Sequence, residues 1–308
     1  MKALYRNLLI IIISLIAVDF FIGFLFAKAS DRALERSPNA MKTEYTIKEV
    51  DADVLIFGSS RANHHYVPDI LEEDFGLSVY NCGKDGLPFY YSAAMFNAVT
   101  QRYSPKMIII DIEPMFLEED YNDYSRAYEL LPFYYKNKLF REISNKRSFF
   151  EPVKALSSMY RYNSRFIAIF SKLIIDDYKF DRGYSPLANS GYKYPDKLSF
   201  TKYDKDVEID SFTDYLLDRT IETAKENNTI LVFSISPRYQ NSNIEEVESW
   251  NYLRAKLERL DNVHLIDNGD ITLVSDSTLY KDGAHLNDNG ARVFTKYIVE
   301  ELSRSFEL

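Results

Sequence analysis

The stretch DVLIFGSSRANHHYVPDIL, residues 53–71, joins an apolar run to a polar segment through Gly58-Ser59-Ser60. The run Val54–Phe57 is typical of a buried strand, and a core strand that ends on two serines has two interpretations. Gly and Ser form ordinary turns. Alternatively, one serine occupies a strand-to-helix turn as a nucleophile, with its hydroxyl exposed at the edge of the sheet. The rest of the chain has to distinguish these two interpretations.

Strand and helix patterns alternate along most of the chain. Runs rich in Val and Ile predict strands at residues 53–57, 78–81, 106–112, 229–235 and 263–266. Helical spacing of apolar residues predicts helices between them, at residues 67–75, 90–103, 212–227, 244–260 and 288–302. This alternation predicts an α/β fold, a parallel sheet with helices on both faces. Ligands bind such sheets at the carboxyl ends of the strands, and Ser59 and Ser60 lie at one of these ends.

The composition excludes one class of partner. The formal net charge is −9 over 308 residues, which argues against nucleic acid because a phosphate backbone requires a basic surface. The chain contains a single cysteine, Cys82, so it cannot form an internal disulfide. We expect Cys82 to be a small buried residue rather than a nucleophile, because no base lies beside it in the sequence.

The N-terminal residues predict a membrane anchor. Leu8–Ala27 contains 15 Leu, Ile, Val or Phe residues, and 20 helical residues span about 30 Å, the thickness of the hydrocarbon core. The alternative is a cleaved signal peptide with Ala27-Lys28-Ala29 as the cleavage site, but the apolar regions of such peptides are shorter, at about 7–15 residues. The sequence therefore predicts an anchor at residues 1–29, a polar linker at 30–50 and a folded domain at 51–308. Basic residues lie on both sides of the span, so charge does not determine its orientation.

Asp19 lies about halfway along this apolar segment. Either it snorkels or faces a sister helix, or it contacts a polytopic membrane partner, because an ionisable group within a bilayer is a candidate functional site. The sequence leaves both interpretations open.

Residues 115–210 interrupt the alternation and contain 12 of the 24 tyrosines. We expect a mostly helical insertion whose aromatic residues form its own core. A smaller possibility is that some of these tyrosines line a glycan groove, since Tyr suits the flat faces of sugars.

A second motif near the C-terminus complements the serines. Asp282 and His285 are three residues apart in a Gly-containing loop before the last predicted helix. A serine nucleophile needs a base to take its proton and a carboxylate to orient that base, and this loop contains both groups. An ordinary turn is the alternative. An EF-hand is excluded because the twelfth residue from Asp282 is Val293 rather than Glu.

These two motifs resemble those of the SGNH, or GDSL-type, hydrolase superfamily, with a flavodoxin-like sheet. The resemblance covers residues 53–303 apart from the insertion, and it implies Ser60 as nucleophile, His285 as base and Asp282 as the residue that orients it. Gly83, in YNCGKDG, matches the glycine whose backbone N–H helps to bind the oxyanion, together with that of Ser60. The resemblance implies no cofactor and no metal, and the adjacent His64 and His65 lack the spacing of zinc ligands.

The third block of the family usually supplies an Asn to the oxyanion hole, and the equivalent IIIDIEPMF, residues 108–116, has none. Membrane-anchored relatives, such as the D-alanyl transfer proteins of teichoic acid and the alginate acetylation proteins, include variants without this Asn. The resemblance thus implies a single-pass membrane protein with its domain outside the cytoplasm. It would hydrolyse or transfer an ester-linked acyl group, acetyl above all, on a cell-surface glycan or other polymer, beside a polytopic membrane acyltransferase. The alternative is a catalytically silent glycan-binding or assembly subunit.

Four further residues are predicted to contact substrate. Arg61 follows the candidate nucleophile, and it either meets an anionic group or is a solvated residue at a helix start. His64 is expected near the mouth of the pocket. Arg238 and Tyr239 follow the fourth predicted strand at its carboxyl end.

Overall fold

Two units make up the chain in the computed structural model. Unit 1 comprises Met1–Tyr45 and Tyr124–Tyr178, and unit 2 comprises Thr46–Asp123 and Lys179–Leu308. The structure describes residues 1–119, 123–174, 182–190, 208–239, 248–258, 260, 263–266, 273 and 275–305.

Five parallel strands form the centre of unit 2. They are β1 (Val54–Phe57), β2 (Val79–Asn81), β3 (Met107–Asp111), β4 (Ile230–Ser234) and β5 (Val263–Ile266). Their order is β2-β1-β3-β4-β5, with all neighbours parallel, which is the flavodoxin-like order. All five strands predicted from the sequence are confirmed, with ends that differ by at most one residue.

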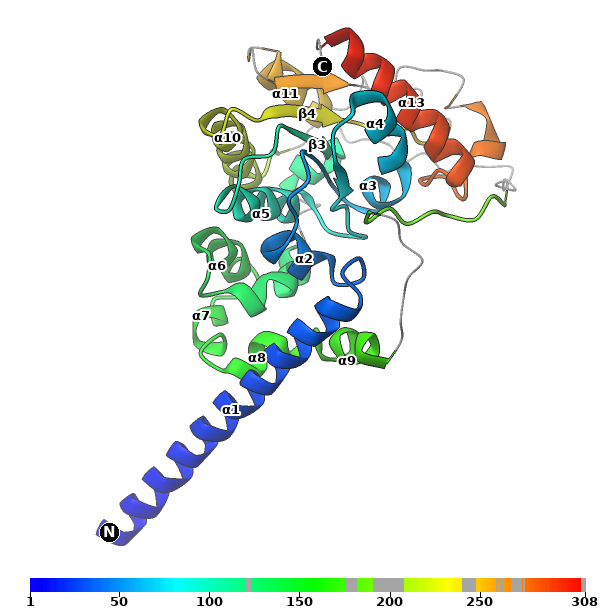
Figure 1. Ribbon diagram of the computed structural model, residues 1–308. Helices are drawn as coiled ribbons and strands as arrows, with labels where there is room; N and C mark the ends of the chain where they lie inside the picture. Colours follow the sequence, from blue (N-terminus) through cyan, green and yellow to red (C-terminus); the bar gives the residue numbers. More distant parts are fainter. Residues whose placement is uncertain are drawn as a thin grey trace. The chain divides into compact units, whose positions relative to one another are not determined.

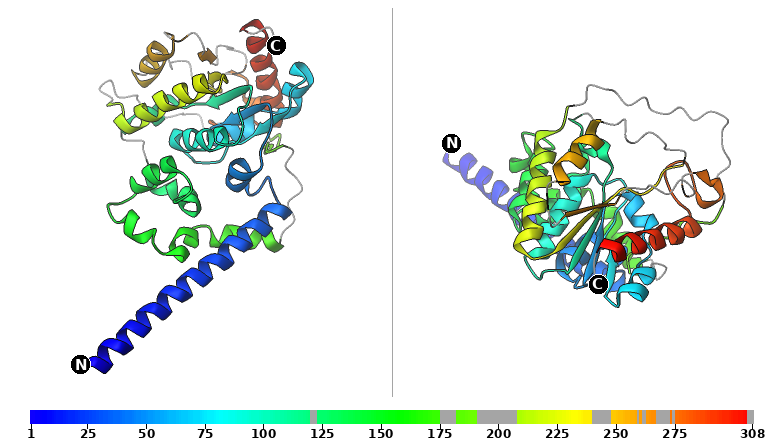
Figure 2. Two further views of the ribbon diagram at one scale, coloured as in Figure 1. Left: turned by 60° about the vertical axis from the view of Figure 1, so that its left-hand side comes forward. Right: turned by 90° about the horizontal axis from the view of Figure 1, so that it is seen from above.

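Helices cover both faces of this sheet (Figures 1 and 2). One face packs against α3 (Ser60–His65), α4 (Pro68–Phe75) and α13 (Asp288–Ser305), where Ile56 and Ile109 share a core with Phe294. The other face packs against α5 (Phe89–Thr100) and α10 (Ser211–Glu226), and Phe233 of β4 lies against Phe89. Unit 2 also contains the helix α11 (Glu248–Leu257) and two short 3-10 segments, η1 (Pro114–Leu117) and η5 (Ser277–Leu279). Burial on both sides explains the continuous Val, Ile and Leu runs of the strands, and the predicted α/β fold is confirmed.

Unit 1 is helical. Its elements are α1 (Lys2–Arg36), η3 (Tyr124–Phe133), α6 (Lys138–Asn145), α7 (Glu151–Lys154), α8 (Ser158–Asn163) and α9 (Phe166–Ile174). The helix α1 is long and apolar enough to cross a membrane, and α8 and α9 pack along its C-terminal half (Figure 1). The predicted insertion is mostly helical over residues 124–174, whereas residues 120–122, 175–181 and 191–207 of it lie outside the described part. Within it, Tyr134 is buried and packs with Leu131 and Ala155, as expected of an aromatic core.

The segment predicted as a polar linker, residues 30–50, differs from that expectation. The helix α1 continues to Arg36, and α2 (Lys42–Lys48) follows at the division between the two units. Ala33, Leu34 and Met41 are buried with Ile169 of α9. The charged residues Glu35 and Arg36 lie between these apolar positions, so the composition of the segment alone does not indicate their burial.

Buried charges also tie this segment into unit 1. The guanidinium of Arg165 forms ion pairs with Glu44 at 2.8 Å and with Glu129 at 2.5 Å. These contacts join α2, η3 and the start of α9. Because leaving one of these charges unpaired would be costly, the first residues of α2, up to Tyr45, are part of the folded unit 1.

Candidate active site

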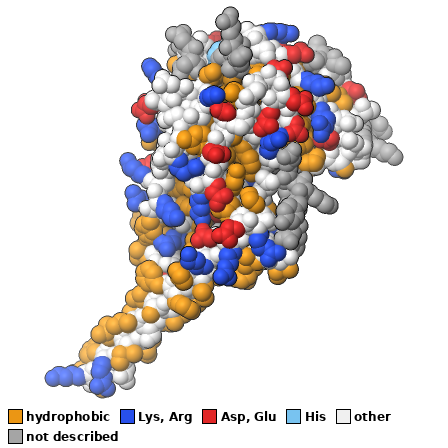
Figure 3. Space-filling model, viewed as in Figure 1, with side chains coloured by type: hydrophobic (Ala, Val, Ile, Leu, Met, Phe, Trp, Pro, Cys, Tyr) orange, Lys and Arg blue, Asp and Glu red, His pale blue; other side chains and the backbone are white. Residues whose placement is uncertain are grey.

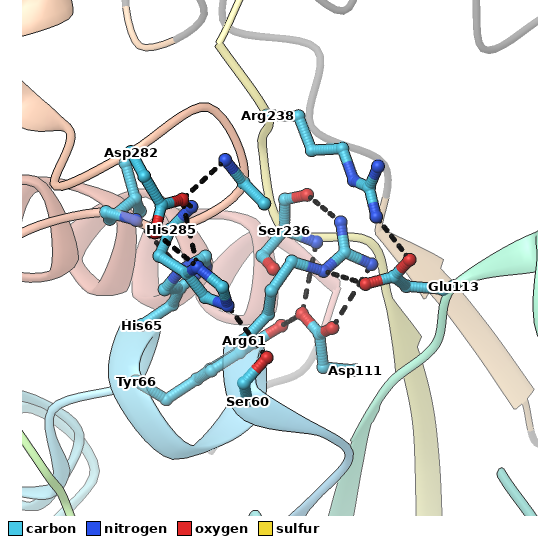
Figure 4. Close-up of polar contacts among 12 residues, drawn as sticks. Ser60, Arg61, His65, Tyr66, Asp111, Glu113, Ser236, Arg238, Asp282 and His285 are labelled. Atoms are coloured by element: carbon cyan, nitrogen blue, oxygen red, sulfur yellow. Dashed lines mark hydrogen bonds and ion pairs between the residues drawn. The ribbon is translucent and has the colours of Figure 1, made fainter. Parts of the chain in front are cut away.

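Ser60, His285 and Asp282 form a hydrogen-bonded series at the carboxyl end of β1 (Figure 4). Ser60 Oγ lies 2.8 Å from His285 Nε2, and His285 Nδ1 lies 3.0 Å from both carboxylate oxygens of Asp282. A carboxylate only accepts, so Nδ1 carries the proton and Nε2 accepts from the serine hydroxyl in the neutral ring. The structure thus brings together the three residues predicted from the sequence, in the geometry that a serine nucleophile requires.

The position of Ser60 follows from the strand-to-helix turn. Ser60 is the first residue of α3, three residues after Phe57, the last residue of β1. Ser59 is the N-cap residue of α3 and is only 5% exposed. Of the two serines, Ser60 is therefore the one whose hydroxyl meets His285.

The loop that contains Asp282 and His285 is held by its own backbone. Asp282 Oδ1 accepts from the backbone N–H of Ala284 at 2.8 Å and from that of His285 at 2.9 Å. Burial raises the pKa of Asp282, but these N–H groups and the His285 imidazole outweigh burial and hold the pKa below its ordinary value. Asp282 thus remains ionised and keeps the His285 ring oriented.

His65 fixes the other side of this loop. Its Nε2 accepts from the backbone N–H of Leu286 at 2.9 Å, and the ring is fully buried. Burial and the nearby Arg61 charge lower the pKa of His65 well below its ordinary value, so the ring is neutral and remains an acceptor. His65 is a positioning residue for the loop that holds His285, a role that its sequence position did not reveal.

Arg61 lies elsewhere than predicted. Its side chain is 3% exposed, so it is not the solvated residue that the sequence allowed. The guanidinium contacts the Asp111 carboxylate at 3.5 Å and the Glu113 carboxylate at 2.9 Å, and Nη1 donates to the Ser236 carbonyl at 2.9 Å (Figure 4). Because these internal partners occupy Arg61, we withdraw the expectation of a substrate contact.

The carboxyl end of β3, where the sequence resemblance would have placed an Asn, contains an ion-pair cluster. Glu113 pairs with Arg61 and with Arg238. Burial raises the pKa of Glu113, but the two guanidiniums outweigh burial and hold it below its ordinary value. The ionised carboxylate accepts hydrogen bonds and cannot donate one to an oxyanion. Arg238 retains 29% side-chain exposure, so its predicted substrate contact stays open.

Close packing against α3 explains why residue 83 is a glycine. A Cβ on this residue would lie 2.5 Å from the backbone N of Asn63 in α3, so only glycine fits here. Its backbone N–H donates to Asn81 Oδ1 at 2.9 Å. The predicted oxyanion role of Gly83 would require a substrate oxygen to compete with that bond, and it stays a prediction, as does the role of the Ser60 N–H.

His64 and Tyr239 border the candidate site in different ways. His64 contacts the Ser185 carbonyl through Nδ1 at 2.6 Å, and its ring lies against that of His285, with centroids 6.0 Å apart. Tyr239 stacks edge-on with Tyr280, and its backbone N–H donates to the Gly283 carbonyl at 3.2 Å. Substrate contact by either residue stays a prediction.

The motifs did not predict the buried cluster around Arg61, but one feature of the sequence indicates it. Asp111 ends β3 and Ser236 follows β4, and polar residues at two neighbouring carboxyl ends indicate a shared polar site. Tyr66 donates to Asp111 at 2.7 Å, and the Ser236 N–H donates to the same oxygen at 3.1 Å. These contacts complete a buried polar cluster beside Ser60 (Figure 4).

The arrangement supports one kind of chemistry directly. Nε2 of His285 can take the Ser60 proton as Oγ attacks an electrophilic carbonyl, and Asp282 can stabilise the resulting imidazolium. Within the described residues, no group of three or more His, Cys, Asp or Glu side chains is placed to hold a metal ion.

Comparison with known proteins gives matches among solved structures only. No family model matches the chain, and no curated protein matches it. A candidate platelet activating factor from Streptococcus pneumonia is 13% identical, with a TM-score of 0.43 over 94% of this chain and 99% of that one. A candidate acylhydrolase from Bacteroides fragilis is also 13% identical, with a TM-score of 0.38 over 82% of this chain and 86% of that one. At this level of likeness neither structure carries an argument about the site, which depends on its own geometry.

Proposed function

We propose that this chain is a serine esterase or O-acyltransferase of the SGNH type, anchored in a membrane by α1. Its substrate class would be ester-linked acyl groups, acetyl above all, on a cell-surface glycan. The observation that carries the proposal is the series Ser60 Oγ, His285 Nε2 and Asp282, with 2.8 Å and 3.0 Å between successive groups.

The reaction would run in two half-reactions. Ser60 Oγ attacks the acyl carbonyl while His285 Nε2 takes its proton, and the ester C–O bond then breaks as His285 returns that proton to the leaving alcohol. The acyl group is now held on Ser60. Water or a sugar hydroxyl attacks this acyl-serine, His285 takes the proton of the attacking oxygen, and Ser60 leaves with that proton. Water as acceptor gives an esterase, and a sugar hydroxyl gives a transferase.

Membrane attachment suits the transferase alternative. An acyl group that reaches a polymer outside the cytoplasm must be supplied across the bilayer, so a polytopic membrane acyltransferase is the class of partner that would deliver it. The α/β unit would then lie on the extracytoplasmic side.

A second candidate function is a catalytically silent glycan-binding or assembly subunit of the same fold. Two observations favour it: Glu113 lies where the family has a donor, and the Gly83 N–H is already bonded to Asn81. Loss of one oxyanion donor typically costs about 10²–10³ in rate. If the chain is such a subunit, Ser60, His285 and Asp282 keep their geometry, but the chain transfers no acyl group because the oxyanion is not stabilised.

Covalent labelling separates the two candidates. The purified full chain is incubated with an alkyl fluorophosphonate, and the modified peptide is identified by mass spectrometry. We expect the label on Ser60, its loss in Ser60→Ala and His285→Ala, and its retention in Ser59→Ala, the matched control one residue away. An unlabelled but folded chain would support the silent subunit instead.

A further inference from the structure

Large apolar side chains are exposed in one continuous segment of unit 1, residues 149–174. Phe149, Ile167 and Ile174 are 89%, 76% and 80% exposed. Among the described residues outside residues 1–36, only three other large apolar side chains are exposed, namely Tyr135, Tyr215 and Val293. A soluble surface rarely gathers such residues unless something covers them. The exposed residues of the segment are Phe149, Phe150, Val153, Leu156, Met159, Phe166, Ile167, Phe170 and Ile174.

This segment is fastened to the apolar part of α1. The Asp19 carboxylate accepts from Ser157 Oγ at 2.5 Å, from the Ser158 N–H at 2.7 Å and from the Met159 N–H at 3.2 Å. Asp19 thus satisfies backbone N–H groups at the start of α8, as an N-cap side chain would. A carboxyl group within the apolar run therefore has partners in its own chain.

Further along α1, the same face stays in contact with the segment. A Cβ on Gly23 would lie 2.2 Å from Ser158 Cβ, so glycine permits α8 to lie directly against α1. One turn later, Phe26 packs against the rings of Tyr162, Phe166 and Phe170. The opposite face of α1 stays exposed and apolar at Phe20, Phe21, Phe24 and Leu25.

The charge of the segment is opposite to that of the chain. Residues 149–174 contain four basic side chains and one acidic one, a net +3, in a chain of net −9. Arg165 is buried and paired with Glu44 and Glu129, so Lys154, Arg161 and Lys172 are the basic groups of the segment that remain at least partly exposed. Anionic lipid headgroups attract basic groups placed beside apolar anchors. The surface thus combines the two features that interfacial helices use.

We infer that residues 149–174 form a lipid-facing surface, which lies at the boundary of hydrocarbon and headgroups where α1 leaves the bilayer. This inference rests on the proposed anchoring by α1. The projecting part of α1 is apolar and has basic residues at its free end (Figure 3). From Leu4 to Asp19 it rises about 22 Å, so most of a hydrocarbon core of about 30 Å is crossed before α8 begins. Interfacial helices bury their apolar faces about 5–10 Å deep, and this depth places Asp19 and its three donors near the boundary.

Fluorescent labels at single sites test the inference. Variants Leu156→Cys and Ile167→Cys of the full chain are labelled with an environment-sensitive maleimide dye. They are reconstituted at low protein content in phosphatidylcholine vesicles, with or without phosphatidylglycerol. Tyr215→Cys of unit 2 is the matched exposed control, Leu15→Cys reports insertion of α1, and the unsubstituted chain gives the background of the buried Cys82. We expect blue-shifted emission and several-fold weaker quenching by iodide at positions 156 and 167 than at 215, with brominated lipids quenching the first two.

Two outcomes would overturn the inference. Equal iodide quenching at positions 167 and 215 would show that water covers the segment. Protection in native membranes but not in lipid vesicles would identify a protein as the occupant. Fluorophosphonate labelling of Ser60 and dye protection at position 15 are read on the same samples. Failure of the lipid-facing surface is thereby distinguished from failure of the proposed chemistry or of the anchor.

Discussion

His285 Nε2 lies 2.8 Å from Ser60 Oγ, although 225 residues separate the two in the chain. The fold explains this meeting, because α13 packs against α3 and α4 on one face of the sheet. The loop before α13 therefore reaches the carboxyl end of β1, where α3 begins. The backbone of Leu286 is bonded to His65, also in α3, so one short helix holds both the serine and the support of the loop that faces it.

Asp282→Asn should reduce kcat/KM for a small acetyl ester while the fold is retained. The amide would offer His285 Nδ1 a poorer partner and would no longer stabilise the imidazolium. In serine proteases this change costs about 10⁴, and we expect a loss nearer 10² because the Asp282 side chain is 51% exposed. Hydrolysis of p-nitrophenyl acetate measures it.

The matched control is Asp276→Asn, which alters a carboxylate that caps a nearby turn by accepting from Thr278. It should leave the rate unchanged. Equal losses in both variants would attribute the effect to disturbance of the loop rather than to the triad.

Glu113→Gln should destabilise unit 2 and alter its response to acid. Removing the charge takes one ion-pair partner from the buried Arg61 guanidinium, at a cost of about 3 kcal/mol. The pKa of Glu113 is depressed in the folded state, so its stabilising contribution is present above the unfolded value of about 4.3 and is lost as pH falls through the folded value. Urea unfolding at several pH values measures the free energy of unfolding of the wild type and of Glu113→Gln. We expect the difference between these two free energies to become smaller as the pH falls. A difference that stays constant would mean that the carboxylate is not ionised in the folded protein.

The sequence predicted some parts of this molecule well because their signals are local. The strands are short Val and Ile runs bounded by turns, and Asp282 and His285 share one loop, so their contact needs no knowledge of tertiary structure. The contact of His285 with Ser60 could be predicted only through the resemblance of both motifs to a family. Ser60 could be distinguished from Ser59 because the third position of the motif coincides with the start of a helix.

Other contacts have no local signal. Arg61 resembles a solvated residue in sequence, and only the meeting of the ends of β3 and β4 beside α3 buries it between Asp111 and Glu113. Asp19 lies 138 residues from Ser157, and no pattern near either residue indicates the other. The buried face of residues 33–41 was concealed by the charges around it. In each case the missing information is the position of a distant element rather than the chemistry of the residue.

His65→Gln should flatten the pH dependence of stability. The folded pKa of His65 lies below the unfolded value of about 6.5, so below that value the unfolded state binds a proton that the folded state excludes. Wild-type stability should thus fall as pH decreases from about 7 to about 5, with a slope from this residue of at most about 1.4 kcal/mol per pH unit. Gln retains an acceptor for the Leu286 N–H but does not titrate. Chemical unfolding at several pH values measures the slope, and an unchanged slope in His65→Gln would contradict the assignment of a neutral buried ring.

Asp19→Ala and Gly23→Ala should both loosen α8 from α1, for different reasons. The first removes the acceptor of three hydrogen bonds at the start of α8, and loss of an N-cap side chain costs about 1 kcal/mol. The second adds a methyl group 2.2 Å from Ser158 Cβ, which forces the two helices apart. Hydrogen exchange of the purified full chain should therefore show faster exchange at the Ser158 and Met159 amides in both variants. Ile16→Ala, an exposed position on the same helix, should leave these amides unchanged, and so should the distant Ser60→Ala. If Asp19→Ala instead left the exchange of α8 unaltered, the carboxylate would be available to a partner within the membrane, as the sequence alone had allowed.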